Sequence, residues 1–220
     1  MKMVNMLSVL LGLLVFTTTP TQTSTCCLPT QMEGTLGFSS GYQVKDKGFR
    51  TEAMFLLAYD VKGKRQSTLG EGVTNGIKFQ THQIDDYAAG KQYTVTNGKC
   101  VIVPLKTEML YCIPSDAKLL KSTFIGFDDK KIDVDMYMFK FQGATVTMSV
   151  TKDTCVPVTE HVTYPNVLVD VGYMGMTSGI KNTTVFDIPK PCQQVGLTGI
   201  HQERNDVEHF RRRRHSPLFL

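Results

Sequence analysis

Hydrophobic and polar residues alternate along much of this chain with the two-residue period of a β-strand. Residues 145–151 place valine and methionine on one side and hydroxyl side chains on the other. The stretches 158–164 and 167–173 alternate in the same way, whereas 49–59 begins with charges on one side and then becomes apolar on both. The pattern predicts half-buried strands in the first three stretches and a strand covered on both faces in the last.

Turn dipeptides separate the predicted strands. Lys62-Gly63, Asn75-Gly76 and Asn97-Gly98 interrupt the alternation, and the Asn-Gly pairs favour turns that need positive φ. Helical periodicity is nearly absent, and the sequence predicts only one or two helical turns over 115–121. Many short strands joined by such turns indicate an all-β sandwich or barrel-like sheet.

The first residues have the layout of a secretory signal peptide. Lys2 is followed by the short apolar run 6–16 and then by small polar residues. That run is well below the roughly 20 apolar residues that span a bilayer, and no later segment approaches this length. We therefore expect a signal peptide over 1–24, one β domain over 25–200, and an extracellular protein without a transmembrane anchor.

Export determines how the cysteines are interpreted. An even number of cysteines in an oxidising compartment indicates disulfides, although six cysteines allow 15 pairings and the sequence by itself does not choose among them. Their wide spacing does not match a four-ligand zinc site. The six are Cys26, Cys27, Cys100, Cys112, Cys155 and Cys192.

Half of the net charge of +4 lies in the last twenty residues. Residues 201–220 hold five arginines against three acids, and the domain over 25–200 carries 18 basic against 17 acidic residues. A nucleic-acid-binding protein carries its positive charge on the folded body, so we expect no nucleic-acid partner. We predict that 201–220 is a disordered basic tail, in which Arg211 to Arg214 are a solvated charge run, a polyanion-binding segment or a protease cleavage site.

Catalytic patterns are weak. Gly37 to Gly41 match the G-x-S-x-G pattern around Ser39, but no helix is predicted after it, so we interpret the segment as a glycine- and serine-rich turn. Outside the tail only His82 and His161 remain, and they form no pair at metal-ligand spacing. We therefore predict that the protein is not an enzyme.

Two carboxylates are the candidates for a metal site. Asp133 and Asp135 are two residues apart, so on a strand both side chains point the same way toward one hard cation. Calcium is thus the one cofactor candidate, with solvated turns as the alternative.

One N-glycosylation sequon is present, Asn182-Thr183-Thr184. In an exported protein it predicts a glycan on an exposed segment.

Methionines on predicted strands suggest a ligand site. Thioethers are flexible and polarisable, which suits a cavity for variable acyl chains, while ordinary core packing is the alternative. The candidate pocket residues are Met136, Met138, Val146, Met148 and Val150.

Five segments, in this order, resemble the ependymin family. The opening Cys26–Gly34 is similar to that family's C-x-x-P start, although Met32 stands where the family usually has tryptophan. The resemblance covers about residues 26–195. The other segments are 56–65, 97–100, 152–158 and 185–192.

The resemblance implies the disulfides Cys26–Cys155 and Cys100–Cys192, which leaves Cys27 for Cys112. It also implies strongly curved antiparallel sheets forming a half-barrel or sandwich around an apolar pocket. Proteins of this family are typically dimeric glycoproteins associated with calcium, extracellular matrix and hydrophobic ligands. We therefore expect a homodimer that carries or senses lipid-like molecules, with a matrix or cell-matrix adhesion component acting through calcium, glycan and basic tail as the alternative.

Overall fold

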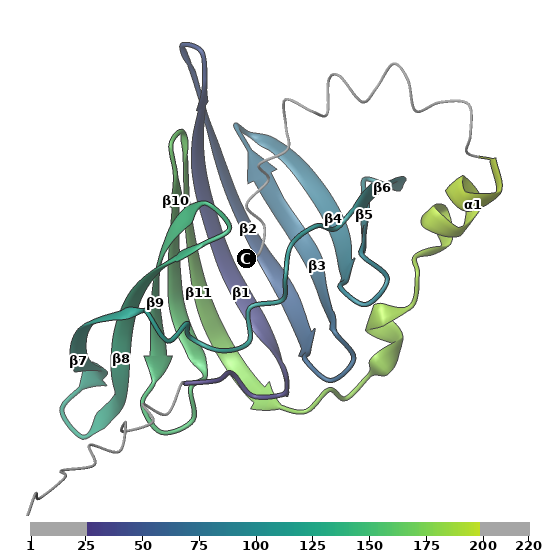
Figure 1. The fold of residues 1–220 in the computed structure, drawn as a ribbon. Coiled ribbons are helices and arrows are strands. Elements are labelled where there is room, and N and C mark those ends of the chain that lie inside the picture. The colour runs from purple at the N-terminus through teal and green to yellow at the C-terminus, as the bar shows by residue number, and fades with distance from the viewer. Residues whose placement is uncertain (1–25, 199–220) are drawn as a thin grey trace, which may run out of the picture.

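The computed structural model describes residues 26–198, so the predicted signal peptide and basic tail lie outside the described residues. Eleven strands form one antiparallel sheet, followed by a short 3-10 helix and an α-helix (Figure 1). The strands are β1 (Gln31–Val44), β2 (Lys47–Asp60), β3 (Arg65–Thr74), β4 (Ile77–Asp86), β5 (Lys91–Thr96), β6 (Lys99–Pro104), β7 (Lys118–Phe127), β8 (Lys130–Phe141), β9 (Ala144–Thr151), β10 (Pro157–Tyr164) and β11 (Val167–Ser178), and the helices are η1 (Thr183–Phe186) and α1 (Lys190–Thr198).

Two meanders make up the sheet. Strands β1 to β6 form one and β7 to β11 the other, and β1 pairs with β11 to join them in the order β6-β5-β4-β3-β2-β1-β11-β10-β9-β8-β7. The connection 105–117 crosses the curved sheet from the edge strand β6 to the opposite edge strand β7 (Figure 1). The predicted all-β, antiparallel, disulfide-linked fold is confirmed, and the sheet remains open because β6 and β7 do not pair.

The predicted Asn-Gly turns are confirmed. Asn75 and Gly76 have φ of 48° and 83°, and Asn97 and Gly98 have φ of 49° and 79°, as a two-residue turn with two positive φ angles requires. Each asparagine also accepts a backbone hydrogen bond through Oδ1, at 2.9 Å from Arg50 N and 3.0 Å from Gln80 N, respectively. The dipeptide therefore sets both the turn and its attachment to a nearby strand.

The two faces of the sheet differ in character. One, which we call the core face, carries the fully buried Leu36, Phe55 and Val146, and Leu110 and Ile113 of the crossing segment pack against it. The opposite side we call the open face. Helix α1 covers the open face only at β5 and β6, where Cys192 packs with Ile84 and other apolar side chains.

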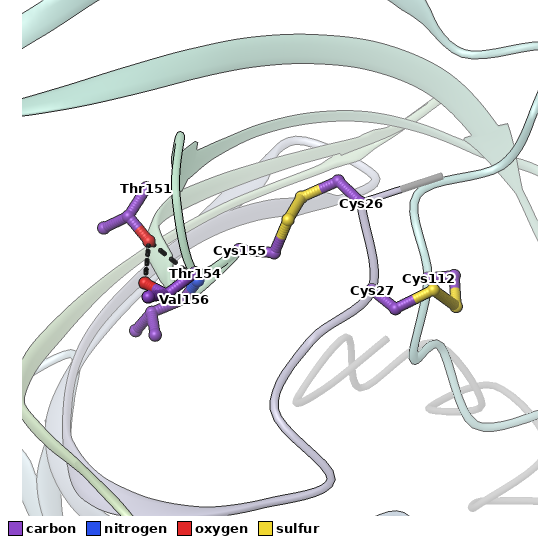
Figure 2. Close-up of a disulfide and its surroundings, with 7 residues drawn as sticks. All are labelled: Cys26, Cys27, Cys112, Thr151, Thr154, Cys155 and Val156. Atoms are coloured by element: carbon purple, nitrogen blue, oxygen red, sulfur yellow. Dashed lines mark hydrogen bonds between the residues drawn. A yellow bond between two sulfur atoms is a disulfide. The ribbon is translucent and has the colours of Figure 1, made fainter. Parts of the chain in front are cut away.

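Three disulfides attach the first and last segments of the described residues to the rest of the fold. Cys26 bonds to Cys155 in the β9–β10 turn, and the adjacent Cys27 bonds to Cys112 in the crossing segment (Figure 2). The third bond joins Cys100 of β6 to Cys192 of α1. The segment that precedes β1 is thereby tied to the second meander and to the crossing segment.

A side-chain cap shapes the turn that presents Cys155. Thr151 Oγ1 accepts a hydrogen bond from Val156 N at 2.9 Å and lies 2.7 Å from the hydroxyl oxygen of Thr154 (Figure 2). Cys155 itself has a positive φ of 52°. These contacts hold the backbone in the conformation that directs the sulfur toward Cys26.

Two local expectations were wrong. Gly37 to Gly41 lie in the middle of β1 and not in a turn, because apolar side chains on either side of the glycines pack into the core face. Residues 114–117 form a turn closed by Ala117 N donating to Pro114 O at 3.0 Å, and residues 118–121 belong to β7, which begins at Lys118. The α-helix lies instead at 190–198, where the third disulfide anchors it.

Candidate ligand-binding site

A groove of about 1100 Å³ lies across the middle of the sheet, spanning β4, β3, β2, β1, β11 and β10. Most of its lining belongs to two cross-strand rows whose side chains point to the open face. One row is Thr159, Gly172, Gly37, Met54, Glu71 and Gln80, and the other is His161, Asp170, Ser39, Glu52, Val73 and Lys78.

Paired glycines make the floor of the groove hollow. Gly37 of β1 is directly opposite Gly172 of β11. A Cβ atom added at Gly172 would meet no atom within 4 Å, and one added at Gly37 would lie 3.3 Å from Met174 Cε and 3.8 Å from Met54 Sδ. The groove thus exists because two neighbouring strands lack side chains at the same level, while flexible methionines lie beside the gap.

An exposed apolar patch adjoins the groove. Its members are Met54, Leu56, Leu69 and Met174, which are between 43% and 61% exposed. Leu56 of β2 pairs with Leu69 of β3. On its other side, Thr35 of β1 pairs with both Leu56 and Met174 of β11, so Thr35 lies between them. We call these four residues the open-face patch. Four large apolar side chains gathered on one surface are typical of a site that binds a hydrophobic partner.

Charged side chains lie along the groove from β10 to β4. On β10 and β11, His161 Nδ1 contacts Asp170 Oδ1. On β2, Arg50 contacts the Glu52 carboxylate, and Lys78 lines the same groove from β4. Charged side chains beside the paired glycines and Met54 suit an amphipathic ligand, since the charges orient a head group while the apolar surface buries a tail.

Ionisable groups are also buried on the core face. Glu160 is completely buried, its Oε2 accepts a hydrogen bond from the Tyr173 hydroxyl at 2.8 Å, and burial raises its pKa from 4.5 to about 7. Burial likewise raises the pKa of Asp85 to about 6, although amide groups of Gln83 and Gln92 donate hydrogen bonds to its carboxylate. Burial therefore makes both acids keep their protons to a higher pH than a solvated carboxyl group does.

The structure separates the five predicted pocket residues. Val146, Met148 and Val150 are buried in the core cluster, and their cross-strand partners on β8 are Phe139, Tyr137 and Asp135, respectively. Strand β8 consequently directs Met136 and Met138 to the opposite face, paired with Ser149 and Thr147. None of the five lines the groove.

The two predicted calcium ligands share one side of β8. Asp135 accepts a hydrogen bond from the Ser122 hydroxyl, and Asp133 is exposed opposite Phe124. Within residues 26–198, no group of three or more His, Cys, Asp or Glu side chains is arranged to hold a metal ion. Calcium binding stays a prediction.

The glycosylation sequon begins at an exposed helix cap. Asn182 Oδ1 accepts hydrogen bonds from Thr184 N at 3.0 Å and from Thr184 Oγ1 at 2.7 Å, and the residue precedes η1. These bonds use only the carbonyl oxygen of the side-chain amide. Glycosylation at Asn182 stays a prediction.

Sequence reasoning missed the residues of the groove. The alternation in β11 and β10 predicts their strands, but nothing local indicates that Gly172 is opposite Gly37, 135 residues earlier in the chain. The available signal is the glycines of β1, but from the sequence alone we interpret Gly37 to Gly41 as a turn.

These features define a class: a single curved antiparallel sheet, joined by disulfides, with a ligand-sized groove across its open face. Neither helical segment between residues 26 and 198 is long and apolar enough to cross a bilayer.

Comparison with known proteins places the chain within this class. The Ependymin family model matches residues 75–192, which is more than half of the chain. Ependymin-related protein 1 of Haliotis asinina is 27% identical over 187 residues, covering 77% of this chain and 90% of that protein. The chain belongs to the ependymin family, as the sequence resemblance predicts. Membership of this family suggests a secreted glycoprotein.

Solved structures of low sequence identity have partly similar folds. An uncharacterized conserved protein from Thermus thermophilus has a TM-score of 0.48 and 12% identity, covering 74% of this chain and 88% of that one. LprF from Mycobacterium bovis has a TM-score of 0.33 and 8% identity, covering 72% and 89%, respectively.

Proposed function

We propose that this chain is an extracellular, non-enzymatic binding protein that carries or senses lipid-like hydrophobic molecules in the open-face groove. The observation that supports this proposal is the groove itself. Its volume of about 1100 Å³ is slightly above the roughly 300–1,000 Å³ of common ligand pockets, which suits an elongated ligand. The open-face patch extends its apolar surface beyond the groove.

The binding energy expected from such a site is substantial. Burying an acyl chain of about twelve methylenes contributes about 10 kcal/mol before the costs of ordering and desolvation, at about 0.8 kcal/mol per methylene. Met54 and Met174 adjust to chains of different shape because the thioether side chain has three rotatable bonds. We therefore expect the site to select ligands by the length and apolarity of their chains more than by one particular chemical structure.

The order of three polar residues supports a non-enzymatic role. Ser39, Asp170 and His161 are neighbours in one cross-strand row, with Asp170 between the other two. A hydrolytic triad needs the imidazole between the hydroxyl and the carboxylate, so this order is unsuitable for activating Ser39. Ser39 also lies within β1 and not on a strand–turn–helix elbow. Any ester hydrolysis in the purified protein should be unchanged in Ser39→Ala.

A leucine in the floor of the groove tests the binding site. In Gly172→Leu the new side chain enters the open space above Gly172 and should weaken binding of the fluorescent fatty acid cis-parinaric acid at least about tenfold, or ~1.4 kcal/mol. The matched control is Gly41→Leu. Like Gly172, Gly41 has no atom within 4 Å of an added Cβ, but it lies on β1 and does not line the groove. Binding is measured by fluorescence titration of the protein secreted from animal cells.

Two results would reject the groove as the ligand site. One is the absence of cis-parinaric acid binding to the wild-type protein, together with no lipid in native mass spectra. The other is equal binding by Gly172→Leu and the wild type. The same material tests secretion and glycosylation, since Asn182→Gln should lower the mass of the secreted protein by one glycan.

A further inference from the structure

A small cavity of about 20 Å³ lies inside the protein, on the core-face side of the sheet. It is enclosed where the two meanders, the N-terminal segment and the crossing segment meet. Four residues with polar side-chain groups reach it, Tyr59, Gln66, Glu160 and Tyr173. The remaining wall is apolar and consists of Leu28, Met32, Leu36, Leu57, Leu110 and Met148.

Two polar atoms at this cavity have no hydrogen-bond partner among the described residues. They are Gln66 Nε2, a donor, and Glu160 Oε1, an acceptor, and both are fully buried. The other carboxylate oxygen of Glu160 is occupied by the Tyr173 hydroxyl. Buried polar groups in folded proteins nearly always have partners, because an unpaired one loses its hydration without compensation. A donor and an acceptor unpaired at the same cavity therefore point to a bound molecule.

We propose that the cavity binds one water molecule, which accepts a hydrogen bond from Gln66 Nε2 and donates one to Glu160 Oε1. A water needs roughly 10–15 Å³ and two to four polar partners, and this cavity provides both. The phenol oxygens of Tyr59 and Tyr173 each donate their proton elsewhere, to Leu110 O and to Glu160, and so remain able to accept the second water proton. An apolar guest of this size would leave both unpaired groups unpaired.

The water connects the two meanders. Gln66 lies on β3 and Glu160 on β10, and three strands separate these two in the sheet order. The curvature of the sheet brings both to one cavity, so the water adds a polar link to the β1–β11 pairing. It serves either protonation state of Glu160, because a water donates to the carboxylate and accepts from the carboxylic acid.

A high-resolution crystal structure of the secreted wild-type protein tests the proposal directly. The expected result is an electron-density peak within hydrogen-bond distance of both Gln66 Nε2 and Glu160 Oε1. An empty cavity, or a direct hydrogen bond between the Gln66 and Glu160 side chains, would overturn it. This experiment needs no variant and does not depend on the groove, so its failure and that of the proposed function are distinguishable.

A double-mutant cycle gives a second, independent measurement. Gln66→Leu and Glu160→Met each remove one end of the bridge, and the unfolding equilibrium constant is measured for both single variants and the double variant. If a water bridges the two side chains, the change in the unfolding equilibrium constant of the double variant should differ about fivefold from the product of the changes in the two single variants. The reason is that water-mediated hydrogen bonds are nearly as strong as direct ones. A double variant whose change in the unfolding equilibrium constant equals the product of the two single changes would contradict the water bridge.

Discussion

Replacing the buried Glu160 by glutamine should stabilise the protein, and only at neutral to alkaline pH. Burial raises the pKa of Glu160 from 4.5 to about 7, so the folded state holds the proton more tightly than the unfolded state. Stability from this group is then fully present below pH 4.5 and is lost as the pH rises through about 7. At about 1.36 kcal/mol for each pH unit between the two pKa values, the loss is about 3 kcal/mol. Glutamine keeps the shape and an acceptor for the Tyr173 hydroxyl, but it cannot ionise.

Urea unfolding followed by far-UV circular dichroism measures this effect, since the chain has no tryptophan for fluorescence. The advantage of Glu160→Gln over the wild type should be about 3 kcal/mol larger at about pH 9 than at about pH 4. Asp85 titrates in a similar range, but it is present in both proteins and cancels in the difference. A difference between variant and wild type that is the same at both pH values would refute the reasoning, because it would mean that Glu160 is already solvated in the folded state.

Two further substitutions test the packing and the cross-links. Gly70→Ala should lower the free energy of unfolding by about 3 kcal/mol, because a Cβ there would lie 1.9 Å from a backbone oxygen of β2. The control Gly41→Ala, in open space, should change the free energy of unfolding by less than about 0.5 kcal/mol. Equal effects of the two substitutions in thermal unfolding would contradict this prediction. Replacing Cys27 and Cys112 together by alanine opens a loop with a sequence separation of 85 residues, and the chain-entropy model predicts a loss of about 4–5 kcal/mol in urea unfolding. A loss below about 1 kcal/mol would show that the crossing segment is held by its packing alone.

Local sequence patterns predicted the elements whose signals are local. The alternation over 145–151 and 158–164 corresponds to β9 and β10 within one residue at each end, and Asn75-Gly76 and Asn97-Gly98 form the expected turns. Period-2 burial and positive φ are properties of a few adjacent residues, so they are readable without knowledge of distant partners. The cysteine pairing, by contrast, came from the family resemblance, since wide spacing leaves the connectivity open.

The tertiary structure decided everything that depends on register between distant segments. The same glycines that resemble a turn in isolation become the floor of a groove, because β1 pairs with β11 and places Gly37 opposite Gly172. Pairing of β8 with β9 sent Met136 and Met138 away from Met148, although all three lie on apolar alternations. Glu160 likewise interrupts an apolar face in the sequence, and only the curvature of the sheet buries it beside Gln66. A one-residue change of register exchanges the two faces of a strand, and in the groove the paired glycines of β1 and β11 lie more than a hundred positions apart in the chain, so local patterns carry no information about their register.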